Sequence, residues 1–279
     1  MSAAALPSVR GALETSGLVS VDARVLLAHV LGCDRAWLMA HAGDALSRDA
    51  AQAFFALAKR RRDGEPVAYL TGRREFWGLD LAVTPAVLIP RPETETLVEV
   101  ALARLPVDRG VRVLDLGTGS GAIALALARE RPQAEVLATD VSPEALDVAR
   151  GNATRLAIGN VTFLRSDWYA GVLPDRYDAI VANPPYIALD DPHLREGDLR
   201  FEPRGALASG VTGLSALATI VAGARDRLAP GGFLAVEHGF DQGDAVRGLF
   251  EASGFIAVEA SRDLAGIWRV VVGQAPATL

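Results

Sequence analysis

The sequence predicts an α/β protein with a doubly wound, mostly parallel sheet, preceded by a small helical domain. From residue 111 onward, short apolar runs typical of buried strands alternate with segments that carry apolar residues at helical spacing. The first of these runs, 111–116, leads directly into a glycine-rich loop and then into a helical segment. Residues 1–65 show only helical spacing.

The N-terminal segment is expected to form four helices, over residues 6–16, 21–31, 34–41 and 47–62. Asp34 and Ser47 are suited to accept the first free N–H groups of the third and fourth helices. The fourth helix ends on the basic run Lys59-Arg60-Arg61-Arg62. This run favours a solvated helix end matched to the helix dipole, or contact with an acidic partner surface or with RNA that a partner carries.

Residues 66–92 are expected to form a conformationally restricted connector. Residues 75–83 alternate around Gly78, which predicts a β-hairpin, and residues 87–89 predict a further short strand. Pro90-Arg91-Pro92 is stiff because each proline fixes its own φ and restrains the preceding residue. We therefore expect a helical domain over 1–65 that recognises the substrate, a β-hairpin linker over 66–92 and an α/β domain over 93–279.

The third segment is expected to begin with a helix over 93–105 and then to alternate strands and helices. Strands are predicted over 111–116, 135–139, 161–165, 177–182, 233–237, 255–259 and 268–272. Helices are predicted over 120–130, 143–156, 214–228 and 242–253. Pro230-Gly231-Gly232 predicts a turn before the fifth strand, and the closely spaced last two strands predict an antiparallel hairpin at one edge of the sheet.

The loop Gly117-Thr118-Gly119-Ser120-Gly121 predicts a site for a nucleotide-like ligand. Glycines let the backbone turn sharply and approach a ligand closely, and the spacing also fits the dinucleotide fingerprint. Asp115 places a carboxylate at the end of the preceding strand, which suits a cationic ligand better than a phosphate. S-adenosylmethionine carries an ammonium, a sulfonium and no phosphate, so the sequence favours it over NAD.

Acidic and aromatic residues follow the next two predicted strands. Asp140 ends the second strand, where a carboxylate can accept both hydroxyls of a ribose. Asp167 and Trp168 end the third strand. An aspartate there can accept from an adenine amino group, and a tryptophan can cover the ring.

The stretch Asn183-Pro184-Pro185-Tyr186 follows the fourth predicted strand. If the first and fourth strands are neighbours in the sheet, this stretch faces the glycine loop across the crevice at the carboxyl ends of the strands. The two prolines remove two N–H donors and stiffen a rim that offers carbonyl acceptors, the Asn183 amide and the Tyr186 ring. Such a rim suits a planar NH2 group, and a site that only holds this nitrogen in line with a sulfonium methyl works by positioning and desolvation.

The composition excludes several classes of protein. The net charge is −6 and the pI is about 5.3, which disfavours direct binding to nucleic acid or to an anionic membrane. The single cysteine fits a reducing cytosol, the four histidines show no metal-ligand spacing, and no signal peptide or membrane-spanning run is evident. We expect a cytoplasmic monomer without a metal.

Three stretches together resemble the PrmC/HemK family of peptide chain release factor glutamine methyltransferases. They are Leu88-Ile89-Pro90-Arg91-Pro92-Glu93-Thr94-Glu95, Asp115-Leu116-Gly117-Thr118-Gly119-Ser120-Gly121 and Ala182-Asn183-Pro184-Pro185-Tyr186-Ile187. Arg200-Phe201-Glu202-Pro203, Glu237-His238-Gly239 and Asp263-Leu264-Ala265-Gly266 are also similar to the family. The first stretch is the more specific signal, since the Asn-Pro-Pro-Tyr motif is shared with DNA adenine methyltransferases.

The resemblance implies a class I methyltransferase fold with a seven-stranded sheet. It implies methylation, with S-adenosylmethionine as donor and S-adenosylhomocysteine as product, of the amide nitrogen of the glutamine in the Gly-Gly-Gln loop of class I release factors. By the same resemblance, donor binding falls to the loop 117–121 with Asp115, Asp140, Asp167, Trp168 and Asn183. Asn183 and the Pro184 carbonyl would accept from the substrate amide beside Pro185, Tyr186 would pack on it, and Glu93 would line the entrance.

Four alternatives remain open at the level of sequence. A glutamine methyltransferase that acts on a ribosomal protein shares these motifs. A DNA or RNA adenine methyltransferase shares the chemistry, but the acidic pI disfavours it. Asp115 and the Asn-Pro-Pro-Tyr stretch disfavour an NAD-dependent oxidoreductase, and the intact motifs on both sides of the crevice disfavour a binding module without catalysis.

Overall fold

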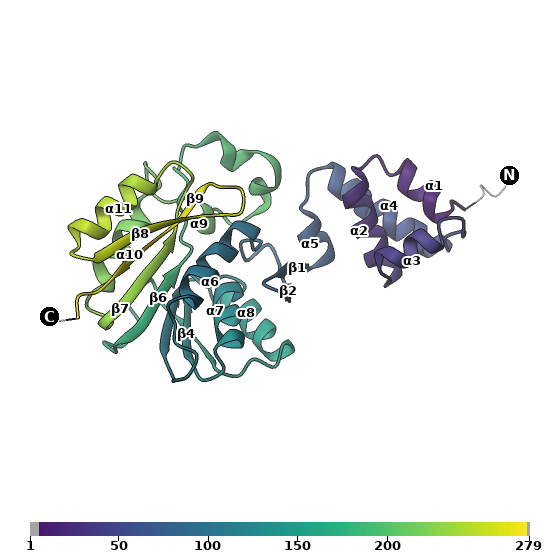
Figure 1. The fold of residues 1–279 in the computed structure, drawn as a ribbon. Helices are drawn as coiled ribbons and strands as arrows, with labels where there is room; N and C mark the ends of the chain where they lie inside the picture. Colours follow the sequence, from purple (N-terminus) through teal and green to yellow (C-terminus); the bar gives the residue numbers. More distant parts are fainter. Residues whose placement is uncertain (1–5, 278–279) are drawn as a thin grey trace. The chain divides into compact units, whose positions relative to one another are not determined.

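The computed structural model describes residues 6–277, which form two compact units divided between Arg73 and Arg74 (Figure 1). Each unit has its own apolar core, built from residues of that unit alone. Residues 1–5 and 278–279, at the ends of the predicted first and third domains, lie outside the described residues. Among the described residues, no helix is long and apolar enough to cross a membrane.

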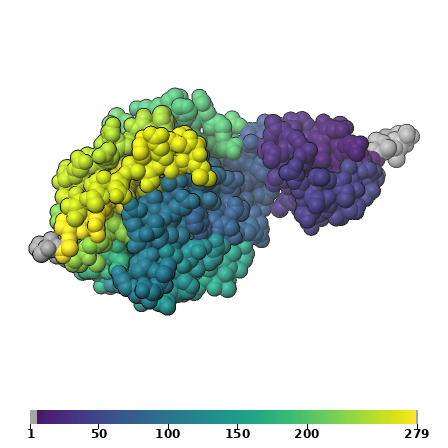
Figure 2. All heavy atoms as spheres, in the orientation of Figure 1, coloured from purple at the N-terminus to yellow at the C-terminus, as the bar shows by residue number. Residues whose placement is uncertain are grey.

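The first unit is helical, as predicted. Its helices are α1 (Val9–Thr15), α2 (Ser20–Leu31), α3 (Arg35–Ala40), α4 (Arg48–Arg62) and α5 (Val67–Thr71). Asp34 accepts a hydrogen bond from the Trp37 N–H at 2.7 Å, and Ser47 accepts one from the Ala50 N–H at 3.1 Å, which confirms both predicted caps. Helix α5 was not predicted. Leu26, Leu27 and Phe54 are fully buried in this closely packed body, which is drawn in purple to blue in Figure 2.

The basic run at the end of α4 is neutralised within the first unit. Lys59 pairs with Asp63 at 2.8 Å, Arg60 with Glu65 at 2.5 Å, and Arg61 with Asp22 at 2.7 Å. Arg62 donates a hydrogen bond to the Ser16 carbonyl. These internal partners favour a structural role for the run at the end of the helix.

The second unit contains a seven-stranded sheet in the order β5-β4-β3-β6-β7-β9-β8. The strands are β3 (Arg112–Leu116), β4 (Glu135–Asp140), β5 (Val161–Arg165), β6 (Tyr177–Ala182), β7 (Leu228–Glu237), β8 (Ile256–Arg262) and β9 (Trp268–Gln274). The first five in chain order pair in parallel, and β9 is antiparallel to both β7 and β8. This confirms the terminal hairpin at one edge. The first and fourth strands, β3 and β6, are neighbours, which meets the condition under which the Asn-Pro-Pro-Tyr stretch faces the glycine loop.

Helices cover both faces of this sheet (Figure 1). The helices of the second unit are α6 (Glu95–Leu102), α7 (Ala122–Glu130), α8 (Pro143–Arg155), α9 (Arg204–Leu207), α10 (Ser215–Ala224) and α11 (Gly243–Ala252), with the 3-10 helices η1 (Pro92–Thr94), η2 (Pro192–Arg195) and η3 (Gly197–Phe201). Neighbouring strand residues enter opposite apolar clusters: Val113 packs with α6 and α7, whereas Leu114 packs with α10 and α11. A parallel sheet covered in this way is buried on both faces.

Two predicted elements differ from the structure. Residues 87–89 are buried but form no strand, because the Val87 N–H bonds to the Thr84 carbonyl and the Ile89 N–H bonds to the Glu202 carboxylate. The predicted turn at Pro230-Gly231-Gly232 lies inside β7, which begins at Leu228. Its register against β6 shifts here, and Gly231 takes a φ of +78°, so the chain absorbs the irregularity without leaving the sheet.

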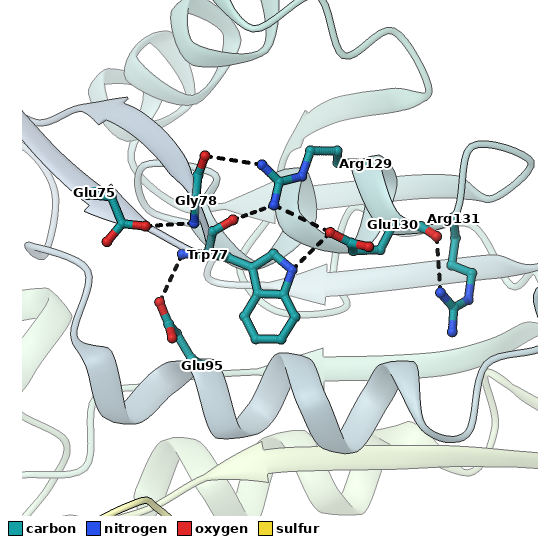
Figure 3. A network of polar contacts seen from close by, with 7 residues as sticks. All are labelled: Glu75, Trp77, Gly78, Glu95, Arg129, Glu130 and Arg131. Carbon is teal, nitrogen blue, oxygen red and sulfur yellow. Dashed lines mark hydrogen bonds and ion pairs between the residues drawn. The ribbon is translucent and has the colours of Figure 1, made fainter.

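The predicted hairpin consists of β1 (Arg73–Phe76) and β2 (Leu79–Ala82). Figure 3 shows how polar contacts fix its turn, which belongs to the second unit, to side chains of α6 and α7. Glu95 of α6 accepts from the Trp77 N–H at 2.9 Å, and Glu130 of α7 accepts from the Trp77 indole at 3.1 Å. Arg129 donates to the Trp77 and Gly78 carbonyls. The hairpin turn is therefore held by two helices of the second unit, α6 and α7.

Candidate active site

A cavity of about 260 Å³ lies at the carboxyl ends of β3, β4, β5 and β6. Five segments far apart in the sequence line it: the stretch that leads into η1 together with Thr94, the glycine loop, the end of β4, the end of β5 and the loop after β6. Residues of the segment 203–206 complete the wall. The charged residues that line the cavity are Arg91, Asp140 and Asp167.

The glycine loop takes a conformation that requires glycine at three positions. Gly117, Gly119 and Gly121 have φ values of +75°, +55° and +85°. The Gly117 and Thr118 N–H groups both bond to the Thr139 carbonyl, at 2.9 and 2.8 Å, which ties the loop to the end of β4. At Gly119 an added Cβ would meet no heavy atom within 4 Å, so this glycine borders open space on the cavity side of the loop.

Asp140 fastens the glycine loop to the entry of α8. One carboxylate oxygen accepts from the Gly119 N–H and the other from the Ser142 N–H, both at 2.9 Å. Asp140 lines the cavity, and each oxygen retains a free lone pair for a further donor. Its predicted role, accepting from two ligand hydroxyls, stays a prediction.

Asp115 lies behind the glycine loop and does not line the cavity. It is fully buried, and its Oδ2 accepts from the Thr118 hydroxyl at 2.7 Å. Its Oδ1 has no hydrogen-bond partner among the described residues. Burial raises the pKa of Asp115 to about 7, against the lowering effect of the Thr118 hydroxyl. Its predicted contact with a bound donor stays a prediction; the acidic groups that line the cavity are Asp140 and Asp167.

Asn152, on α8, holds the back of the glycine loop. Its amide nitrogen donates to the Ser120 carbonyl at 2.9 Å and to the Ala82 carbonyl at 3.0 Å, and its oxygen accepts from the Ala82 N–H at 2.7 Å. The side chain is completely buried. One amide thereby joins the predicted hairpin to the predicted ligand loop, which the sequence did not reveal because this asparagine lies inside an ordinary helix.

Asp167 and Trp168 line the cavity after the end of β5, as the sequence led us to expect. Trp168 has a φ of +46°, which is unusual for a residue with a large side chain. Its ring would lie 3.6 Å from a Cβ added to Gly117, an ordinary van der Waals distance, so the ring lies next to the glycine loop. The structure therefore brings an aromatic face and a carboxylate to one end of the cavity.

The Asn183-Pro184-Pro185-Tyr186 loop faces the glycine loop across the cavity. Asn183 and Pro185 line it, whereas Pro184 is buried beside them and Tyr186 packs behind. The Asn183 amide nitrogen donates to the Thr94 hydroxyl at 3.1 Å, which leaves its carbonyl oxygen free to accept. Gln242 donates to the Tyr186 carbonyl at 2.9 Å and fixes the far end of the loop.

An ion pair holds together two further walls of the cavity. Arg91 pairs with Glu202, which is 4% exposed and also accepts from the Ile89 N–H at 3.0 Å. Burial raises the pKa of Glu202, and the Arg91 guanidinium opposes that shift. The pair links the Pro-Arg-Pro stretch to the segment 203–206, and Arg91 is thereby neutralised by a protein partner.

Glu93 does not line the cavity; it is partly exposed, on η1. Sequence reasoning assigned no role to four residues that support the site, namely Thr94, Asn152, Glu202 and Glu237. Three of them lie in stretches that carry the family resemblance, which was the available signal. Among residues 6–277, no group of three or more His, Cys, Asp or Glu side chains could hold a metal ion.

Comparison with known proteins finds relatives along almost the whole chain. The family model described as "PrmC N-terminal domain" matches residues 5–72, and the one described as "Methyltransferase small domain" matches residues 94–194. The chain is 55% identical to a release factor glutamine methyltransferase of Xylella fastidiosa (strain Temecula1), over 95% of this chain and 96% of that protein. It is 54% identical to one of Burkholderia pseudomallei, over 95% of each chain.

Solved structures support the fold. The crystal structure of a methyltransferase from Pyrococcus furiosus matches with a TM-score of 0.55 at 21% identity, covering 78% of this chain and 97% of that one. At this identity the match shows the class I methyltransferase fold alone.

Proposed function

Because the chain belongs to the family of release factor glutamine methyltransferases, we propose that it methylates the side-chain amide nitrogen (N5) of the glutamine in the Gly-Gly-Gln loop of class I peptide chain release factors. The donor is S-adenosylmethionine. One observation carries the proposal at the level of the site. Asn183 lies on the cavity wall with its amide nitrogen engaged by Thr94, so its carbonyl oxygen is the group left to accept from an NH2.

The cavity suits S-adenosylmethionine, which supplies an electrophilic methyl group on a sulfonium. Asp140 would accept from the ribose hydroxyls, and Trp168 with Asp167 would meet the adenine. The cavity is lined by two carboxylates and by one arginine, whose charge is already balanced by Glu202. The local charge is therefore negative, which favours a cation over a pyrophosphate. The glycine loop borders the space between these groups.

The residues of the chain would act by positioning. A glutamine amide nitrogen is a weak nucleophile because its lone pair is delocalised into the carbonyl. Asn183 and the Pro184 carbonyl would accept from the two amide hydrogens and hold the nitrogen toward the donor end of the cavity. As positive charge develops on the nitrogen, these oxygens would stabilise it, and one hydrogen then leaves as a proton.

We expect S-adenosylmethionine and S-adenosylhomocysteine to raise the melting temperature, and NAD to leave it unchanged. A ligand that binds only the folded state stabilises it by ~2.7 kcal/mol at a hundredfold excess over Kd. Asp140→Ala should remove most of this stabilisation, because it removes the acceptor and frees the Gly119 N–H. Differential scanning fluorimetry checks both statements. A rise in melting temperature with NAD, and none with S-adenosylmethionine or S-adenosylhomocysteine, would contradict the donor assignment.

Incubation with labelled S-adenosylmethionine tests the reaction itself. Purified class I release factor should accept one methyl group on the Gly-Gly-Gln glutamine, located by mass spectrometry, and a release factor with that glutamine replaced by alanine should accept none. Ribosomes and DNA serve as the other arms. Methylation of a ribosomal protein or of adenine, with the release factor unlabelled, would overturn the proposal.

We also propose that the protein acts as a cytoplasmic monomer without direct contact to nucleic acid.

A further inference from the structure

Asn152 is a buried polar side chain near the cavity that has no part in the proposed reaction. It lies on α8, is completely buried and does not line the cavity. A buried amide opposes folding unless its hydrogen bonds are made, so asparagine inside a helix is ordinarily exposed. The partners of Asn152 therefore show what this position requires.

The Asn152 amide uses its full hydrogen-bonding capacity. Its nitrogen donates to the Ser120 carbonyl at 2.9 Å and to the Ala82 carbonyl at 3.0 Å. Its oxygen accepts from the Ala82 N–H at 2.7 Å and from the Arg155 guanidinium at 2.9 Å. Two donated and two accepted bonds are all that a primary amide offers. An aspartate has the same size but lacks the two donors, so the contacts specify asparagine.

The bond to Ser120 holds the glycine loop. Ser120 lines the cavity and lies between Gly119 and Gly121, whose φ values are +55° and +85°. A Cβ added to Gly121 would lie 3.3 Å from the Cβ of Ala149, which precedes Asn152 by three residues on α8. Residues three apart share one face of a helix. This face of α8 therefore both packs against the loop and binds its backbone.

The bonds to Ala82 hold another wall of the same cavity. Ala82 is the last residue of β2, and the chain runs on from there to residues 86–88, which line the cavity. Asn152 bonds to both the N–H and the carbonyl of Ala82, as a neighbouring strand would. Arg155 adds a bond to the Asp80 carbonyl. The end of β2 is thereby fixed to α8.

We propose that Asn152 is a positioning residue for the methyl donor: it sets the spacing between the glycine loop and the segment 86–88, and so the affinity of the cavity for S-adenosylmethionine. The inference rests on the proposed function, which places this donor in the cavity. Within residues 6–277, the hydrogen bonds of Asn152 do not reach the loop after β6, which Thr94 and Gln242 hold. Its effect is therefore on donor binding and not on the transfer step.

Asn152→Asp tests this inference, because aspartate keeps the size and the accepting oxygens and removes the two donors. The Kd for S-adenosylmethionine and for S-adenosylhomocysteine, measured by calorimetry, should rise about tenfold, the effect of losing one hydrogen bond that holds the loop. At saturating donor, kcat and the KM for release factor should stay within about threefold of the native values. A purely structural role would instead lower the folded fraction, and hence kcat, and leave the donor Kd unchanged.

Asn160→Asp is the matched control. The Asn160 amide also donates to backbone carbonyls, those of Ala128, Arg131 and Ala134, at 3.1, 3.2 and 3.0 Å. None of these residues lines the cavity. This variant should lower the melting temperature of the ligand-free protein and leave the donor Kd within about twofold, because its lost bonds hold neither wall. An equal rise of the donor Kd in both variants would overturn the positioning role.

Hydrogen exchange of the native protein tests the same link without a substitution. Coupling between two sites is reciprocal, so saturating S-adenosylhomocysteine should slow exchange of the Ala82 N–H at least about fivefold more than that of the Arg112 N–H. The Arg112 N–H is the control because it also bonds to a side-chain oxygen, Asp178 Oδ2, at 2.8 Å, and Arg112 begins β3. Equal slowing of both amides would overturn the inference. This measurement decides the question if Asn152→Asp fails to fold.

These outcomes are distinguishable from failure of the proposed function. A native-like donor Kd in Asn152→Asp, beside a native protein that methylates release factor, would overturn the positioning role and leave the proposed function intact. A native protein that binds no S-adenosylmethionine in calorimetry would overturn the donor assignment, and both the proposed function and the role of Asn152 would fall with it.

Discussion

Replacing Asn183 with alanine should lower single-turnover methylation of release factor by roughly 10²–10³-fold, equivalent to ~2.7–4 kcal/mol of transition-state stabilisation. The lost carbonyl oxygen borders the cavity and has no competing role in the loop, because the amide nitrogen makes the contact to Thr94. Donor affinity should stay within several-fold, since the donor is held mainly by the loops after β3, β4 and β5. Rapid-quench kinetics beside calorimetric titration with S-adenosylmethionine measure both quantities.

Asn183→Asp is the informative companion to this variant. An aspartate still accepts, but its carboxylate cannot donate to the Thr94 hydroxyl. We therefore expect it to be nearly as slow as alanine. Turnover close to the native rate in Asn183→Ala would show that the loop is a structural turn and that the acceptor nitrogen binds elsewhere.

Deleting residues 1–72 should lower kcat/KM for intact release factor by at least about 30-fold while leaving donor affinity within threefold. Every residue that lines the cavity lies after residue 85, and the second unit has its own two apolar clusters. The first unit instead exposes apolar side chains, with Val21 and Val25 on one face of α2 and Met39 on α3. Losing a docking surface with one or two strong contacts costs about 2 kcal/mol or more, which gives the 30-fold figure.

A short peptide that carries Gly-Gly-Gln is the control for the deletion. At high concentration the truncated and native proteins should methylate it at similar rates, because the peptide depends on the cavity and not on docking elsewhere. Circular dichroism and the S-adenosylmethionine-dependent thermal shift confirm that the truncated protein folds. Unimpaired methylation of intact release factor by the truncated protein would contradict the assignment of substrate recognition to the first unit.

The sequence by itself determined the class of fold and most of its elements. Buried parallel strands need continuous apolar runs, so β3, β4, β5 and β6 were found within one residue of their ends. The caps at Asp34 and Ser47 and the terminal antiparallel hairpin followed from equally local signals. The pairing of β3 with β6 was only a condition in the sequence argument, and the structure supplies it. Local signals failed where a distant side chain accepts a hydrogen bond from the backbone. The Ile89 N–H donates to the Glu202 carboxylate, so the apolar run 87–89 forms no strand.

The sequence also named the residues around the cavity, since Gly117–Gly121, Asp140, Trp168 and Asn183 follow strands that end at one edge of the sheet. Only the tertiary structure decided how they are held and which way they face. Asp115 turned out to lie behind the glycine loop, which Asn152 supports from α8. Thr94 and Glu237 turned out to support the loop after β6 from η1 and β7. The physical reason is that hydrogen-bond direction and burial depend on partners that folding brings together: Asn183 and Thr94 are 89 positions apart in the chain, and nothing in either local stretch records their contact.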